Sequence, residues 1–525
     1  MKRTLRFASA GGLLAVAVGL AVQPQVSEAR EGKQILMETC QGCHLPEGND
    51  ALSRISHQRK TPEGWLMTIG RMQTMHQLQI SDEDRRTLVK YLADTQGLAP
   101  SETDGVRYAL ERRLNTVEKI EEPTQQMCAR CHSGARIALQ RRPAQEWERL
   151  VNFHLGQWPS LEYQALSRDR DWFDLAKKDM VPLLAQKYPF DSKAWSDWQK
   201  SMPKSATLAG DWSFSGHLPG KGELNGVMKV TAEDGDRFKV SLDGQYADGT
   251  PFKGDGSAVL YSGYEWRGTV TVDGVSMRQV LAANNGQLSG RMFDKTHDER
   301  GLDFTAAQQG SARLLAVQPG YVKAGSESEL TLVGSGLSGT PSFGKGVEVV
   351  EVLENTPQRI RVKVKASAEA ASGLQEVAVG KLGGQQLAVY REIAEVKVVP
   401  AFSVARVGDN GGSTPKVQGR FDAEAWGQGA DGKAYRIGVF PAKWKVEPFD
   451  ERAREDEDVK FAGVMQADTG VFTPGDAGPN PARKMSTNNA GNLKVIAAVD
   501  DAGTARTGEG QMIVTIQRWN NPPIP

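Results

Sequence analysis

Two short strings of cysteine and histidine carry the clearest chemistry in this chain. One runs Cys-Gln-Gly-Cys-His from Cys40 to His44, and the other runs Cys-Ala-Arg-Cys-His from Cys128 to His132. The cysteines of the chain all fall in these strings: Cys40, Cys43, Cys128 and Cys131. Two thiols on one helical turn can form thioethers to one haem, and the next histidine can bind its iron. The spacing predicts two haem c groups, with His44 and His132 as proximal ligands.

Two other interpretations of a Cys-x-x-Cys pair fit this sequence less well. A redox-active dithiol belongs in a thioredoxin-like βαβ unit, and neither string has that pattern around it. A zinc site could use both cysteine pairs, or one pair with two histidines. The gap between the pairs is far longer than in common zinc ribbons, and a histidine follows each pair at once. These features favour haem.

An internal repeat narrows the choice of the second iron ligand, which is usually methionine or histidine. The candidates are His57, Met67, Met72, Met75, His76, His154 and Met180. Arg54-Ile55, Gln58-Arg59-Lys60, Trp65 and Met72 recur 82 positions later as Arg136-Ile137, Gln140-Arg141-Arg142, Trp147 and His154. Only Met72 and His154 occupy a position that can bind iron in both copies. Met180 lies beyond the repeat, and the remaining candidates align with Leu139, Arg149, Gln157 and Trp158.

The residues around Met72 predict the helix that would carry it. Thr61 is a typical N-cap, and Pro62 suits the first helical turn. Trp65, Ile69 and Met72 then fall on one helical face, and the second copy repeats this with a tryptophan and a histidine. We therefore expect each helix to present a tryptophan and an iron ligand to its haem. Simple core packing is the alternative for the methionine and the histidine.

The predicted ligand pairs differ between the two haems. The first would be bound by His44 and Met72, and the second by His132 and His154. Methionine raises the reduction potential, so the first haem should be the better electron acceptor, and the pair suits a relay.

Trp65 and Trp147 are further candidate haem contacts, and so are Arg54 and Arg136. The two arginines could neutralise haem propionates, with surface solvation as the equal alternative.

Length, charge and the N-terminus set the broad class of the protein. A chain of 525 residues exceeds one hydrophobic core, and its zero net charge gives no reason to expect a nucleic-acid partner. Lys2, Arg3 and Arg6 precede a short apolar stretch and the small residues of Ser27-Glu28-Ala29. This predicts a cleaved export signal over residues 1–29 and a periplasmic protein, since the stretch is short for a membrane anchor. We expect no later membrane span.

The period of the apolar residues changes after residue 204. Residues 30–204 are predicted to form an all-α dihaem cytochrome c domain. Alternating residues and Asp-Gly turns, as at Asp273-Gly274, then predict an antiparallel β-barrel or meander over 205–310. An immunoglobulin-like β-sandwich over 311–397 and a C-terminal β-sandwich over 398–525 complete the expected multidomain fold, with all three β domains antiparallel.

These residues carry a resemblance to a known family. Arg-Ile-x-x-Gln-Arg-Lys-x-Pro-Glu-Gly-Trp at 54–65 and Glu-Trp-x-x-Leu-Val-Asn-Phe-His at 146–154 resemble the α subunit of quinohaemoprotein amine dehydrogenase, and the resemblance covers the whole chain. It implies a three-subunit periplasmic enzyme that oxidises primary amines to aldehydes and ammonia. Its cysteine tryptophylquinone belongs to a small γ subunit, and a β-propeller forms the β subunit. The α subunit passes electrons from the quinone to an acceptor such as azurin or a cytochrome c.

The cysteine count agrees with that division of labour. The quinone needs a cysteine cross-linked to a tryptophan, yet every cysteine here belongs to a haem motif. We therefore expect no catalytic residue in this chain and a quinone on a partner. A dihaem peroxidase is one alternative, but it needs an open iron position that the predicted ligands do not leave. A stand-alone dihaem carrier with β interaction modules is the other.

Overall fold

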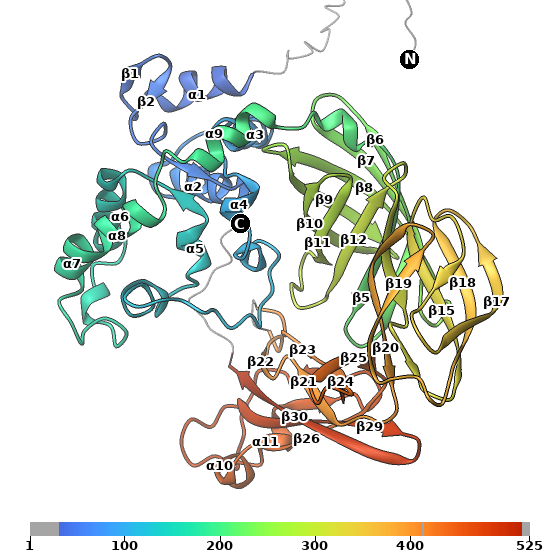
Figure 1. The fold of residues 1–525 in the computed structure, drawn as a ribbon. Coiled ribbons are helices and arrows are strands. Elements are labelled where there is room, and N and C mark those ends of the chain that lie inside the picture. Colours follow the sequence, from blue (N-terminus) through green and yellow to red (C-terminus); the bar gives the residue numbers. More distant parts are fainter. Residues whose placement is uncertain (1–30, 412–413, 517–525) are drawn as a thin grey trace, which may run out of the picture.

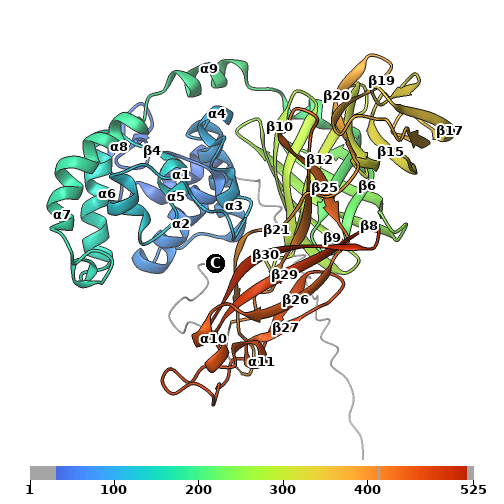
Figure 2. The same cartoon turned by 60° about the horizontal axis from the view of Figure 1, so that its bottom comes forward.

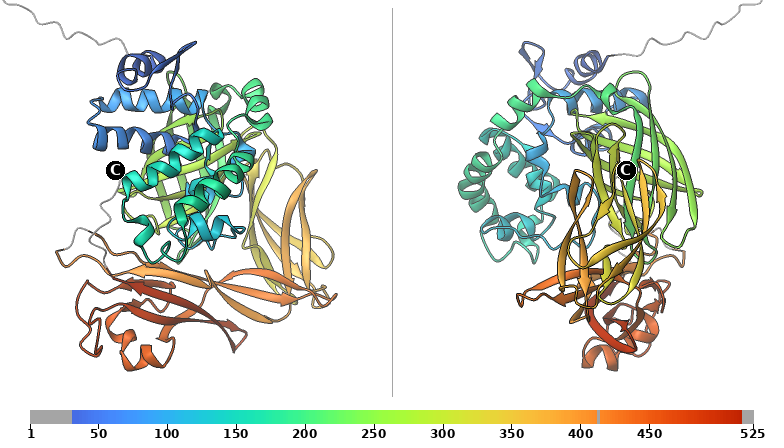
Figure 3. Two further views of the ribbon diagram at one scale, coloured as in Figure 1. Left: turned by 90° about the vertical axis from the view of Figure 1, so that its left-hand side faces the viewer. Right: turned by 45° about the vertical axis from the view of Figure 1, so that its right-hand side comes forward.

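The structure is a computed structural model that describes residues 31–411 and 414–516. The predicted export signal, residues 1–29, lies outside the described residues. A helical unit is followed along the chain by a β-barrel and two further β units (Figure 1). The barrel lies between the helical unit and the third unit in two views (Figures 1 and 2). The helical unit lies in front of the barrel when seen from its own side (Figure 3, left).

The helical unit contains short strands as well as helices. Its helices are α1 (Gly32–Cys40), α2 (Pro62–His76), α3 (Asp82–Thr95), α4 (Pro100–Thr103), η1 (Arg107–Ala109), η2 (Gln125–Ala129), α5 (Ala135–Ala138), α6 (Ala144–Gln157), η3 (Leu161–Tyr163), α7 (Trp172–Leu175), η4 (Ala176–Met180), α8 (Val181–Lys187) and α9 (Lys193–Ser201). Its strands are β1 (Pro46–Gly48), β2 (Ala51–Leu52), β3 (Arg59–Lys60) and β4 (Gln140–Arg141), which pair as β1-β2 and β3-β4. The prediction of an all-α domain is therefore not confirmed, because β-pairing joins distant segments of this unit.

Local capping determines where the main helices begin. The Thr61 side chain accepts a hydrogen bond from the Gly64 amide at 3.3 Å, and Pro62 follows as the first residue of α2. The predicted helix start is confirmed. Helix α2 ends where Gln77 adopts a left-handed backbone with a φ of 56°.

The sequence repeat becomes a twofold relation in space. Strand β3 pairs antiparallel with β4, so that Arg59 faces Arg141 and Lys60 faces Gln140. Arg59 and Arg141 are equivalent residues of the two copies, which places an approximate twofold axis between them. Farther along, the guanidinium of Arg71 lies 5.9 Å from the ring centre of its own equivalent, Phe153. Helices α2 and α6 are thus related by this axis.

One buried carboxylate neutralises the arginines on the axis. Glu102, from the link between the copies, accepts hydrogen bonds from Arg59 at 2.9 and 3.0 Å and from Arg141 at 3.1 Å. All three side chains are nearly inaccessible to solvent. Burial alone would raise the pKa of Glu102, but bonds from Arg59 and the Ala99 amide and the charge of Arg141 lower it to about 2. Glu102 therefore holds the two copies together as an anion.

The second unit is a closed barrel of eight strands, so the barrel alternative is confirmed. Helix η5 (Ser205–Leu208) leads into strands β5 (Gly210–Leu218), β6 (Gly222–Ala232), β7 (Arg237–Tyr246), β8 (Pro251–Tyr261), β9 (Glu265–Val272), β10 (Val275–Asn284), β11 (Gln287–Asp294) and β12 (Gly301–Gln308). Asp273 and Gly274 both have positive φ between β9 and β10, as the predicted hairpin turn requires. Trp212, Phe214 and Trp266 fill the barrel core.

The third unit packs two sheets around one core. One sheet orders β13 (Arg313–Gln318), β15 (Glu327–Ser335), β18 (Arg359–Ala366) and β17 (Val347–Asn355). The other orders β14 (Tyr321–Lys323), β20 (Leu382–Tyr390), β19 (Gly373–Val379) and β16 (Pro341–Ser342). Leu332 and Val362 from the first sheet meet Val377 and Leu387 from the second.

Over residues 395–411 and 414–516, the fourth unit has three sheets and two short helices. Its sheets order β21 (Glu395–Val399), β24 (Asp422–Gln428) and β25 (Ala434–Phe440); β22 (Phe402–Arg406), β30 (Thr504–Thr515), β29 (Gly491–Asp501) and β26 (Lys443–Pro448); and β23 (Gly419–Arg420), β28 (Val471–Pro474) and β27 (Gly463–Met465). Its helices are α10 (Glu451–Glu455) and α11 (Asp458–Phe461). Among the described residues, every helix is too short or too polar to cross a membrane.

The expectation of purely antiparallel β domains is wrong at two edges. Strand β14 runs parallel to β20, and β22 runs parallel to β30. Each follows the preceding strand after a short link that contains Pro319 or Pro400. The chain changes sheets at these links without a hairpin reversal, so the new edge strand pairs in the parallel sense.

Polar contacts fix the helical unit on the barrel. Arg267 of β9 pairs with Glu63 in the first turn of α2 and with its neighbour Glu265. Arg291 of β11 donates to the backbone oxygens of Glu111 and Arg112, at 2.9 and 2.7 Å, in the link between the two copies. The barrel thus holds both the first copy and the inter-copy link.

Replacing Glu102 by glutamine should destabilise the helical unit. The change leaves Arg59 and Arg141 buried without their counter-charge, which costs about 3–5 kcal/mol in the free energy of unfolding. Because the pKa of Glu102 is lowered, its contribution is complete above about pH 4.5 and is lost as the pH falls through about 2. Urea unfolding followed by helical circular dichroism should show the loss at neutral pH and a smaller difference in acid.

The control is Asp197→Asn, which removes a carboxylate from an exposed pair with Lys193 on α9. Its unfolding curve should match that of the unmodified protein. Equal behaviour of the two variants would mean that Glu102 does not hold the copies together.

Candidate functional site

The first cysteine motif forms a tight turn at the end of α1. The amides of Cys43 and His44 both donate to the carbonyl oxygen of Cys40, at 3.1 and 3.0 Å. The two thiols and the imidazole therefore leave the backbone within one turn. His44 Nδ1 lies 2.8 Å from the carbonyl oxygen of Ser53. Because a carbonyl can only accept, Nδ1 carries the proton and Nε2 keeps its lone pair for a metal.

The second motif has a different backbone but the same imidazole arrangement. Cys128 lies in η2, a turn of π-helix, and Cys131 follows just beyond it. His132 Nδ1 lies 3.0 Å from the carbonyl oxygen of Ser133, so here too Nε2 is the free nitrogen. Burial lowers the pKa of His132, which favours the neutral ring that binds metals.

The cysteine environments disfavour the dithiol and zinc interpretations. Burial raises the pKa of the Cys40 thiol to about 11 and that of Cys128 to about 12, whereas redox-active thiols have lowered values. Cys40 packs against the hydrophobic cluster of Trp65 and Ile69, and Cys128 packs against that of Trp147 and Val151. The two pairs therefore lie in separate cores and do not share one metal.

His154 lies on α6 with its ring prepared for ligation. Its Nδ1 is 2.7 Å from the carbonyl oxygen of Leu150, one turn earlier, which again leaves Nε2 free. Its pKa is lowered by burial and by the nearby charges of His132, Arg136 and Arg71. Because the charge of His132 affects the pKa of His154, the predicted proximal and distal ligands of the second haem lie near each other. Ligation itself stays a prediction.

Met72 occupies the equivalent place in the last turns of α2. Its side chain is half-buried, and its carbonyl accepts the capping bond from the Gln77 amide. The structure thus places Met72 and His154 at matching positions of two symmetry-related helices, as the repeat requires. Iron ligation by Met72 stays a prediction as well.

Several of the rejected candidates have other partners. His57 Nε2 lies 2.6 Å from a carboxylate oxygen of Glu47. The sulfur of Met67 accepts from Arg71 at 3.2 Å and from Arg136 at 3.4 Å. Met180 is buried in the hydrophobic cluster of the second copy. Met75 and His76 are exposed on α2.

The two predicted tryptophans have equal burial but unequal partners. Trp65 and Trp147 are each 1% exposed, within the core of their own copy. The Trp65 ring nitrogen donates to the carbonyl oxygen of Gln96 at 3.1 Å. The Trp147 ring nitrogen is buried and has no acceptor among the described residues. A buried donor without an acceptor is costly, and a carboxylate of a bound group would satisfy it.

The two predicted arginines each cross to the other copy. Arg54 donates to Glu146 of α6 at 2.8 Å, and Arg136 reaches the sulfur of Met67 on α2. Arg54 is 42% exposed on its side chain, so part of it faces solvent. Both positions lie between the copies, and their contact with haem propionates stays a prediction.

Sequence reasoning missed a group of buried cations beside the axis. Lys60 and Arg142 are 6% and 4% exposed, and they occupy equivalent positions of the repeat. Lys60 lies 5.2 Å from the ring centre of Trp65, and Arg142 lies 5.8 Å from that of Trp147. The repeated Gln-Arg-Lys and Gln-Arg-Arg strings were the available signal, because charged residues repeated beside a buried tryptophan are unusual for a solvated face.

The residues around the axis fit groups that carry carboxylates. Glu146 is 1% exposed and pairs with Arg54, Arg142 and Arg149. Lys60 forms no ion pair within the described part of the chain. Burial and the charges of Arg142 and Arg71 hold the pKa of Lys60 well below its usual range. A haem in each copy would bring the propionates that this positive region lacks.

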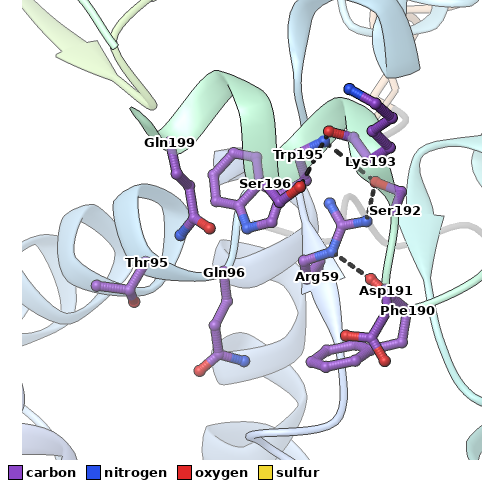
Figure 4. A pocket seen from close by; sticks show the side chains of 10 residues that line it. All are labelled: Arg59, Thr95, Gln96, Phe190, Asp191, Ser192, Lys193, Trp195, Ser196 and Gln199. Carbon is purple, nitrogen blue, oxygen red and sulfur yellow. Dashed lines mark hydrogen bonds between the residues drawn. The ribbon is translucent and has the colours of Figure 1, made fainter. Parts of the chain in front are cut away.

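A hollow of about 520 Å³ lies beside the Arg59–Glu102 pair. It lies beside α9 and is lined by Arg59, Thr95, Gln96, Phe190, Asp191, Ser192, Lys193, Trp195, Ser196 and Gln199 (Figure 4). Arg59 Nε donates to the Phe190 carbonyl at 2.7 Å, and another nitrogen donates to the Ser192 hydroxyl at 3.1 Å. The hollow therefore borders the support of the Arg59–Glu102 pair, and we assign no ligand to it.

Three solved structures that resemble parts of this chain are distant likenesses. A de novo designed fluorescence-activating β-barrel is 24% identical, covers 21% of this chain and 100% of its own, and has a TM-score of 0.19. A redesigned β-barrel is 16% identical over 20% and 94%, with a TM-score of 0.18. A Bacteroides ovatus protein of a mixed-linkage glucan utilization locus is 9% identical over 60% and 68%, with a TM-score of 0.19. No curated protein matches.

Family models match the chain in four consecutive parts. The model of quinohemoprotein amine dehydrogenase A, alpha subunit, haem binding, matches residues 30–195. The models of alpha-subunit domains II, III and IV match residues 205–309, 311–391 and 396–524. The resemblance carried by the cysteine motifs and the repeat is thereby confirmed. Because the four matches follow one another along nearly the whole chain, the protein belongs to the family of quinohaemoprotein amine dehydrogenase α subunits.

Proposed function

We propose that this chain is the electron-transfer subunit of a periplasmic amine dehydrogenase and carries two covalent haem c groups. The observation that carries the proposal is the pair of Cys-x-x-Cys-His motifs, in which His44 and His132 each have Nδ1 at a carbonyl and Nε2 free. The haem-binding family match over residues 30–195 supports it. The predicted export signal supports the periplasmic location.

The residues of this chain hold and tune the two groups. Four thiols would form the thioethers: Cys40, Cys43, Cys128 and Cys131. His44 and His132 would bind the irons from one side, with Met72 and His154 opposite them. The hydrogen bond from His154 Nδ1 to the Leu150 carbonyl would strengthen electron donation from the ring to a bound iron and so favour ferric iron, whereas methionine sulfur would favour ferrous iron. When bound, each haem supplies an iron that carries one electron at a time.

The amine chemistry belongs to a partner in this proposal. Primary amines would be oxidised to aldehydes and ammonia at a cysteine tryptophylquinone on a small γ subunit, with a β-propeller as the β subunit. An external redox protein such as azurin or a cytochrome c would accept the electrons. We propose residues 30–204, 205–310, 311–397 and 398–525 as the domains. The three β domains would serve as the scaffold for these subunits, and the domain over 311–397 would be immunoglobulin-like.

Mass analysis of the native complex tests the whole proposal. The α chain should carry the mass of two haems, and the smallest co-purifying subunit should stain for a quinone. A colourless α chain would exclude the haem function. A coloured chain that purifies alone would favour the stand-alone carrier.

Replacing Met72 by alanine should convert one of the two haems to a high-spin form. Loss of the thioether sulfur opens the iron and lowers the potential of that haem, since methionine raises it. Optical and electron paramagnetic resonance spectra would detect the change. Met75→Ala is the matched control, because Met75 is exposed on the same helix. An unchanged spectrum for Met72→Ala would remove Met72 from the iron.

Replacing His154 by alanine should have the same effect on the other haem. The variant loses the free Nε2 that the Leu150 carbonyl orients. The signal that remains low-spin should differ from the one that remains in the Met72 variant. His57→Ala serves as the control, because His57 is paired with Glu47. If both variants affected the same haem, the assignment of one distal ligand to each copy would be wrong.

A further inference from the structure

Five charged side chains beside the twofold axis form what we call the axial cluster. Its members are Lys60, Arg142, Arg71, Arg54 and Glu146. Lys60 and Arg142 each interact electrostatically with the other members of this set. Lys60, Arg142 and Glu146 are almost fully buried. The cluster therefore gathers four cations and one carboxylate at the junction of the two copies, and two of the cations, Arg54 and Arg142, pair with that carboxylate.

The described residues do not balance the charge of the axial cluster. Glu146 pairs with Arg54 at 2.8 Å and with Arg142 at 3.8 Å. Within the described residues, the only hydrogen-bond acceptor of Lys60 Nζ is the Thr68 hydroxyl, at 2.6 Å. Burying a cation without a counter-charge is costly, so such a group is normally paired or binds an anion. Arg59 and Arg141 differ from Lys60 in this respect, because both pair with Glu102.

Each side of the axial cluster leads to one haem-attachment motif. Lys60 lies against Trp65, which shares a hydrophobic cluster with Cys40. Arg142 lies against Trp147, which shares a cluster with Cys128. The Trp147 ring nitrogen, buried without an acceptor, adds a neutral donor on that side. Lys60 and Arg142, which are equivalent in the repeat, therefore extend from the axial cluster to the buried tryptophan of the first and of the second copy.

We propose that the axial cluster binds propionate carboxylates of both haems, so that one set of buried cations serves two iron centres. The proposal rests on the two-haem function proposed above. Carboxylates would supply the anionic acceptor that Lys60 lacks and a closer one for Arg142, whose only ion pair among the described residues is with Glu146 at 3.8 Å, and charge-assisted bonds to carboxylates are strong. Positive charge beside a haem stabilises its reduced form. The shared cluster thus raises the reduction potentials of both haems together.

The test measures the two midpoint potentials of the purified native complex in a spectroelectrochemical titration. Lys60→Met removes the charge but keeps an apolar stem, and both potentials should fall. Lys60→Arg keeps the charge and copies the residue at the equivalent position of the second repeat, so both potentials should stay. If Lys60→Met does not fold, Arg71→Gln takes its place as the variant that removes a charge, and it should also lower both potentials.

Controls separate the cluster from a general effect of charge. Lys239→Met removes a cation that is 74% exposed on the barrel and should leave both potentials unchanged. The fall caused by Lys60→Met should persist at high salt, because buried charges are screened far less than exposed ones. A fall of similar size for Lys239→Met would overturn the proposal.

The remaining outcomes are equally clear. A fall in only one potential would mean that the cluster serves one haem, and no fall in either would mean that it binds no propionate. Either result overturns the shared site. Haem content per chain, measured on the unmodified protein, tests the proposed function separately. Two haems with unmoved potentials would reject only the axial cluster, whereas absent haem would reject the function beneath it.

Discussion

The helical unit depends on the buried contact of Arg59 and Arg141 with Glu102. Two equivalent arginines of the repeat face each other across the short β3-β4 pair, where they would repel one another without a shared anion. Glu102 comes from the link between the copies, so the same contact also fixes the path of that link. This pairing sets the relation between α2 and α6. Every candidate ligand on those helices takes its position from it.

A second group of cations lies beside the same axis, and the chain provides it with less neutralising negative charge. Around Glu102 the chain supplies an anion with a bidentate geometry and a strongly lowered pKa. Around Glu146 the chain supplies one carboxylate for several cations, and the pKa of Lys60 is held well below its usual range. A domain that is complete without other groups would be expected to balance both. The difference separates a contact that holds the copies together from a region prepared for bound carboxylates.

The barrel acts as the base on which the helical unit is fixed. Trp212 and Trp266 belong to a core that fills its interior, which leaves its outer surface for contacts. Arg267 binds Glu63 at the start of α2. Burial and the charge of Glu63 raise the pKa of Glu265 to about 8, although Arg267 acts in the opposite direction. Arg291 holds the link that supplies Glu102. The barrel thus supports both elements that position the two copies.

The cysteine motifs and the repeat with an offset of 82 positions can be read directly from the sequence. The Thr61 cap and the turn at Asp273 could be predicted from it, since each depends on neighbouring residues. The tertiary structure alone decided how the copies meet. Pairing of Arg59 with Arg141, neutralisation by Glu102 and the parallel edge strand β14 join residues far apart in the chain. Periodicity records which face of an element is buried but not which distant element covers it. Long-range charge pairing and strand order therefore depend on packing that no local pattern encodes.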